Sequence, residues 1–83
     1  MLAEALEHLV RGLVSNPDDV AVKDKDLHRG RILEVRVNPS DVGKVIGRQG
    51  RTATALRTVV KALAGRERVQ VDFVDVDRPR RGR

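Results

Sequence analysis

A pair of glycines, Gly47 and Gly50, constrains this chain more than any other feature, because helical patterns lie directly on both sides. Residues 42–46 have apolar side chains at helical spacing, and the same spacing returns over residues 53–63. Glycine has no Cβ, so it permits a sharp backbone turn and the close approach of another group. The pattern therefore predicts a short helix and a long helix joined by a tight turn. The predicted apolar face of the long helix comprises Ala53, Leu56, Val59, Val60 and Leu63.

Three strands and an N-terminal helix are predicted in addition to these two helices. Residues 1–15 repeat apolar side chains every three or four positions, which predicts a helix that stops at Pro17. Alternating or short apolar runs predict strands at residues 20–23, 31–38 and 67–74. The first two strands are expected to form an antiparallel hairpin across a polar loop, residues 24–30. The predicted fold class is α+β, a three-stranded sheet packed against three helices in the order α-β-β-α-α-β.

The chain has 83 residues, enough for one small domain, and it contains no cysteine. Disulfides, thiolate nucleophiles and cysteine-ligated metal sites are therefore excluded. No apolar run approaches the roughly 20 residues that span a bilayer, and no signal-peptide pattern opens the chain, so a cytoplasmic protein without membrane contact is expected. Residues 1–77 are expected to form the domain, followed by a basic, disordered tail at residues 78–83.

Charge is distributed unevenly along the chain, whose formal net charge is +5. Residues 42–66 contain six Lys or Arg and no Asp or Glu, and the last six residues contain four arginines. This pattern indicates a polyanionic partner, most simply a nucleic acid. Lys44, Arg48 and Arg51 surround the glycine pair, and the N–H groups at the start of the following helix attract phosphate.

Catalytic interpretations fail on spacing. A dinucleotide-binding fingerprint needs G-x-G-x-x-G after a strand, and a P-loop needs Lys and then Ser or Thr after its last glycine, whereas Gly50 is followed by Arg51. The isolated histidines and serines that could ligate a metal or act as nucleophiles are His8, His28, Ser15 and Ser40. None has a partner at a recognisable spacing, so no enzyme, metal or cofactor is expected.

The segment Ile46-Gly47-Arg48-Gln49-Gly50 between two helices resembles the I-G-x-x-G signature of KH domains. The helix-first order of elements resembles the bacterial type II form of that domain. Over residues 1–77 the chain resembles the KhpA (YlqC) family of small bacterial proteins with a single KH domain, most strongly from Ser40 to Thr52.

The resemblance implies a noncatalytic protein that binds single-stranded RNA through the G-x-x-G loop, as an RNA chaperone or post-transcriptional regulator. The RNA-binding residues it implies are Lys44, Ile46, Gly47, Arg48, Gln49, Gly50, Arg51 and Thr52. Arg36 or its neighbours on the second strand would form the far edge of the base-binding groove. The implied protein partners are a second copy of the chain and a KhpB/Jag-like KH protein.

Several alternatives stay open at this point. The chain could be a dimerisation or protein-interaction subunit of an RNA-binding complex in which a partner holds the RNA, and the bound strand could be DNA. Arg57 and Lys61 are as consistent with a solvated helix face as with ligand contact. Phe73, the only aromatic residue, is expected in the core, so base stacking on aromatic side chains is not expected.

Overall fold

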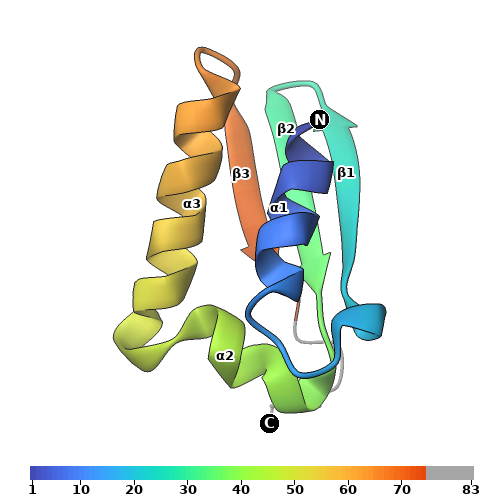
Figure 1. Ribbon diagram of the computed structural model, residues 1–83. Coiled ribbons are helices and arrows are strands. Elements are labelled where there is room, and N and C mark those ends of the chain that lie inside the picture. The colour runs from blue at the N-terminus through green and yellow to red at the C-terminus, as the bar shows by residue number, and fades with distance from the viewer. Residues whose placement is uncertain (75–83) are drawn as a thin grey trace, which may run out of the picture.

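The computed structural model of the chain describes residues 1–74, in which a layer of helices covers a three-stranded sheet (Figure 1). The helices are α1 (Leu2–Arg11), α2 (Val42–Ile46) and α3 (Arg51–Ala64), and the strands are β1 (Ala21–Leu27), β2 (Gly30–Arg36) and β3 (Val69–Phe73). The predicted α+β class and order of elements are confirmed. The predicted tail at residues 78–83 lies outside the described residues.

β2 is the central strand of the sheet. It pairs antiparallel with β1, where Val22 lies opposite Val35, and parallel with β3, where Leu33 lies opposite Val71. A parallel neighbour cannot be reached through a tight turn, so α2 and α3 form the crossover from β2 to β3. As a result, α2 lies at one end of the sheet, and the β1–β2 turn and the α3–β3 connection lie together at the other (Figure 1).

The hydrophobic core fills the space between the sheet and the helices. Alternation along β2 turns Leu33 and Val35 toward the helices, where both are buried. The buried apolar side chains that the helices contribute are Leu6, Val10, Val45, Ala53, Leu56 and Val60. Burial of each Val or Leu contributes roughly 1.5–3 kcal/mol, so this core holds α2 and α3 firmly against the sheet and positions the turn between them.

β1 is longer than its sequence pattern predicts. The expected loop at residues 24–30 is wrong over its first half, because β1 continues to Leu27 and pairs with β2 up to Gly30. Asp24, Lys25 and Asp26 are charged and, like Leu27, exposed, so the added residues carry no apolar alternation that could indicate a strand. Their strand conformation comes from backbone pairing with β2.

Two helices bury less of their apolar surface than predicted. α1 ends at Arg11 and not at residue 15, and Leu13 beyond it is 42% exposed. On α3, the predicted core positions Val59 and Leu63 are 42% and 57% exposed. Only one narrow stripe of α3 reaches the three-stranded sheet, and these two side chains lie beside that stripe.

Candidate functional site

The turn between α2 and α3 is a short segment of unusual backbone, Gly47 to Gly50. Gly47 (φ 78, ψ 173), Gln49 (φ 56, ψ 27) and Gly50 (φ 74, ψ 14) all have positive φ. The Gly47 N–H donates to the Gly43 carbonyl at 2.9 Å, and the Gly50 N–H donates to the Gly47 carbonyl at 3.1 Å. These bonds end one helix and start the next within four residues, as the glycine pair predicts.

The two glycines are required for different reasons. A Cβ on Gly47 would lie 2.9 Å from the backbone N of Thr52 and also against the Thr52 side chain, and its φ and ψ are those that essentially only glycine adopts. A Cβ on Gly50 would meet nothing within 4 Å. The turn is therefore packed against α3 on the Gly47 side and open to an approaching group on the Gly50 side.

Positive charge is concentrated on the open side of the turn. Arg48, Gln49 and Arg51 are exposed, and Arg51 Nη2 lies 3.5 Å from Gln49 Oε1. Among residues 1–74, neither Arg48 nor Arg51 forms an ion pair with a carboxylate. No side chain caps the N-terminus of α3 at Gly50. The positive end of the helix dipole and two arginines therefore act at the same place, which favours phosphate.

The remaining predicted site residues, Lys44, Ile46 and Thr52, lie in α2 and α3 beside the turn. Ile46 and Thr52 are half-buried, Ile46 against the core and Thr52 against Gly47. The Lys44 ammonium donates to Ser15 Oγ and lies 3.6 Å from Asp41 Oδ1. Lys44 therefore offers less free charge to the turn than Arg48 and Arg51 do.

A groove of about 440 Å³ runs beside α3, between that helix and the edge strand β3. Its lining residues are Thr54, Arg57, Thr58, Lys61, Val69, Gln70, Val71 and Asp72. Arg57 does not point freely into solvent: its Nε donates to the Val71 carbonyl at 3.3 Å, and its guanidinium lies 5.2 Å from the centre of the Phe73 ring. Sequence reasoning did not identify this groove.

Arg36, expected at the far edge of the base-binding groove, does not line the groove between α3 and β3. Arg36 lies near Lys23 and Glu34, on the face of the sheet that the helices do not cover. β3 pairs with β2 on the side of α3 and so becomes the strand that borders the helix. The available signal was the order of elements, because a strand that follows a helical crossover returns parallel beside the strand before it.

Comparison with known proteins identifies the domain. A family profile described as KhpA/KhpB, KH domain matches residues 3–76. The chain belongs to this family. Its observed order of elements is that of a type II KH domain, in which Gly47 to Gly50 lie between α2 and α3.

Similar proteins in the KhpA/KhpB family span nearly the same length. One from Streptomyces coelicolor, named RNA-binding protein KhpA, is 69% identical over 80 residues, which is 96% of this chain and 100% of that protein. Proteins of the same name from Leifsonia xyli subsp. xyli and Mycobacterium tuberculosis are 64% and 58% identical, over 90% and 93% of this chain and 99% and 95% of their own lengths.

Residues 1–74 contain neither a membrane-spanning helix nor a cluster of metal-ligating side chains. No helix in this part is both long enough and apolar enough to cross a membrane. No three His, Cys, Asp or Glu side chains gather there in a way that could hold a metal ion.

Proposed function

We propose that the chain is a noncatalytic protein that binds single-stranded RNA through the Gly47–Gly50 loop. The observation that carries this proposal is the open side of Gly50 at the uncapped start of α3, flanked by Arg48 and Arg51. In KH domains the G-x-x-G loop clamps the backbone of about four nucleotides. The name RNA-binding protein KhpA, carried by relatives up to 69% identical, supports the same ligand.

We propose that the bases of the RNA bind in the α3–β3 groove. The Arg57 guanidinium lies over the Phe73 ring, and arginine planes in such a groove can stack on bases. Gln70 and Asp72 supply polar groups along β3 for the edges of bases. No aromatic side chain within residues 1–74 offers a free stacking surface, so little base specificity is expected.

We propose that the protein acts in the cytoplasm in RNA chaperoning or post-transcriptional regulation. Weak, unselective binding of RNA matches such a role. One loop that engages about four nucleotides gives low affinity. Self-association, or pairing with a KhpB/Jag-like KH protein, would raise the effective affinity by adding a second loop.

The test is fluorescence anisotropy of a labelled single-stranded RNA titrated with the full chain and with Arg48→Asp/Gln49→Asp. The matched control is Arg36→Asp/Lys23→Gln, which removes the same amount of positive charge from the uncovered face of the sheet. The loop variant should lose at least about tenfold in affinity while its circular dichroism stays unchanged, and the control should lose far less.

A folded loop variant that binds RNA like the parent would refute this site. Unlabelled DNA of the same sequence, used as a competitor, separates RNA binding from general single-strand binding. RNA should compete better if groups beside the groove contact the 2′-hydroxyls.

A second candidate function, that of a protein-interaction subunit, is favoured by apolar side chains on the outer surface of the helix layer. Leu9 and Leu13 of the α1 end and Val59 and Leu63 of α3 are 38–57% exposed. α1 and α3 pack against each other, so these side chains belong to one layer of the domain (Figure 1). Such a surface suits a second copy of the chain or another KH protein.

A further inference from the structure

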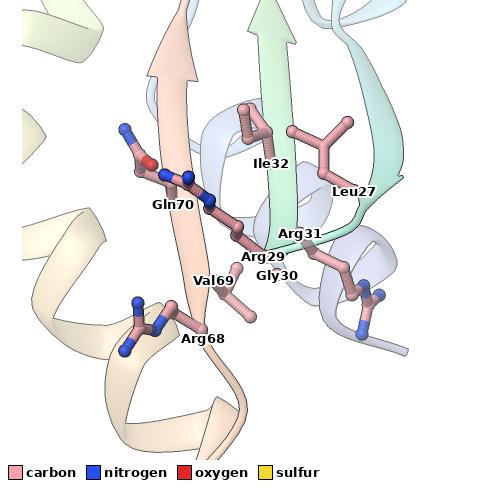
Figure 2. Close-up of a pocket in the computed structure, with 8 residues that line it drawn as sticks. All are labelled: Leu27, Arg29, Gly30, Arg31, Ile32, Arg68, Val69 and Gln70. Carbon is pink, nitrogen blue, oxygen red and sulfur yellow. The ribbon is translucent and has the colours of Figure 1, made fainter.

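A second basic hollow lies at the end of the sheet opposite α2 and the glycine loop, where the β1–β2 turn meets the α3–β3 connection (Figures 1 and 2). Its volume is about 420 Å³. Its lining residues are Leu27, Arg29, Gly30, Arg31, Ile32, Arg68, Val69 and Gln70. Figure 2 shows the Arg29 side chain extending toward Gln70. The Arg68 side chain points away from Gln70, toward α3.

Arg31 makes the rim of this hollow rigid. Its Nε donates to Asp24 at 3.1 Å and its Nη1 donates to Glu67 at 2.9 Å, which ties β1, β2 and the α3–β3 connection together. The backbone N–H of Arg31 donates to the Arg68 carbonyl at 2.9 Å. A Cβ on Gly30 would lie 2.6 Å from that same carbonyl, so the β1–β2 turn is packed directly on the start of β3.

The same contacts leave two positive charges for a ligand. Arg31 forms ion pairs with both Asp24 and Glu67, and Lys25 pairs with Glu34 at 3.0 Å. Asp26, at the end of β1, lies opposite Arg31 in the strand register. Arg29 and Arg68 form no ion pair within residues 1–74.

The hollow is adjacent to the α3–β3 groove. Val69 and Gln70 line both, so only the first residues of β3 separate them. Arg68 lines the hollow immediately before those residues, and Lys61 lines the groove beside them. A strand that leaves the groove at this end therefore meets Arg68 first and then the hollow.

We propose that this hollow is a second contact for the bound RNA strand, beyond the nucleotides held at the glycine loop. Arg29 and Arg68 bind phosphates, Ile32 and Leu27 form an apolar floor for a base, and the Gln70 amide meets the edge of that base. This proposal rests on the proposed RNA-binding function. The position of the hollow, directly beside the groove proposed for the bases, favours RNA over an acidic protein segment, which would not need to lie next to that groove.

The experiment compares labelled oligouridylates of four and twelve nucleotides, titrated at several salt concentrations with the full chain and three variants. Arg29→Gln/Arg68→Gln removes the two positive charges of the hollow that form no ion pair within residues 1–74. Lys23→Gln/Arg36→Gln removes the same charge from the far end of the same face of the sheet. Arg48→Asp/Gln49→Asp reports separately on the glycine loop.

The hollow variant should bind the short oligomer within about twofold of the parent, because that oligomer fits the loop alone. It should bind the long oligomer about fivefold more weakly, and its salt slope should fall by about 1.4, or about 0.7 for each lost phosphate contact. The Lys23/Arg36 control should show less than half of either effect.

Equal losses in the hollow variant and its control would overturn the proposal, because they would indicate unspecific electrostatics. Unchanged affinity for the long oligomer would also overturn it and would favour an acidic protein ligand. Failure of the proposed function would look different, since the loop variant would then bind both oligomers like the parent.

Discussion

At the scale of single residues, the two glycines of the loop have different roles: one allows close packing within the protein, and the other leaves room for a ligand. Gly47 lets the loop fold back on Thr52, whereas Gly50 keeps the outer side of the loop free. Gln49 adopts φ 56 without being glycine, an uncommon conformation for a residue that carries a Cβ. The loop therefore combines one position that the fold needs with one that the ligand needs.

Substitution of the two glycines should separate these roles. Gly47→Ala should lower the free energy of unfolding by roughly 2–4 kcal/mol, because the methyl group collides with Thr52 in a backbone conformation that strains alanine. Gly50→Ala should cost only about 1–2 kcal/mol, for the positive φ alone, yet weaken RNA binding in the folded protein. Urea unfolding and anisotropy measure the two effects. Equal stability of the two variants would contradict the packing role of Gly47.

At the scale of elements, a buried carboxylate joins the segment that follows α1 to the start of α2. Asp41 is fully buried and accepts hydrogen bonds from the backbone N–H groups of Ser15 and Asn16, at 3.1 and 3.0 Å, and from the Asn16 side chain. Burial by itself raises the pKa of Asp41, but these hydrogen bonds and nearby Lys44 outweigh it and hold the pKa below its ordinary value of 3.8. The ionised form is therefore the one that stabilises the fold.

The depressed pKa predicts how acid affects the fold. The stabilisation from Asp41 should be complete above its unfolded-state pKa, near 3.8, and should disappear as the pH falls through the lower folded-state pKa. Asp41→Asn should lower the unfolding temperature by about 5–10 °C at pH 7, because an amide cannot accept all of these bonds. This difference from the parent should shrink below pH 4.

Thermal unfolding followed by circular dichroism from pH 2 to pH 7 measures that difference. Asp18→Asn is the matched control, because Asp18 is exposed on the α1–β1 connection. A gap between Asp41→Asn and the parent that stays constant over the whole pH range would contradict the assignment.

At the scale of the whole molecule, the outer surfaces differ in how well they suit a second copy. Along the free edge of β1, Lys23 and Lys25 point to the uncovered face of the sheet, and Asp24 and Asp26 point to the helix side. Two β1 edges paired antiparallel about a two-fold axis would place lysine opposite lysine or aspartate opposite aspartate, which is destabilising. The exposed apolar side chains of the helix layer are the better self-association surface.

Polar substitutions on α3 should therefore weaken self-association. We expect the parent to sediment increasingly as a dimer as its concentration rises, and Val59→Gln/Leu63→Gln to remain a monomer, because the substitutions remove the apolar area that would be buried. Leu27→Gln, a similarly exposed leucine on β1, is the control and should behave like the parent. Analytical ultracentrifugation measures this, and a parent that is monomeric at every concentration would refute the helix-mediated dimer.

Features that depend on local chemistry were predictable from the sequence. Two glycines between helical patterns predicted the turn from α2 to α3, because glycine's backbone freedom acts where it stands. The alternation around Leu33 and Val71 predicted strands that face a core, because side-chain direction repeats every two residues along any strand. The same local pattern, matched to the KH signature, located Arg48 and Arg51 at the proposed phosphate site.

Contacts between distant segments decided the rest, and no local pattern encodes them. Pairing with β2 extended β1 through charged residues to Leu27, and the parallel return of β3 placed Gln70, not Arg36, beside α3. The fold also brought Asp41 to Ser15 and Asn16, and Lys44 to Ser15. Sequence alone determined which segments form helices, strands and the glycine turn; only tertiary structure decided which charges remain free, because a charge is neutralised by whichever partner the fold places beside it.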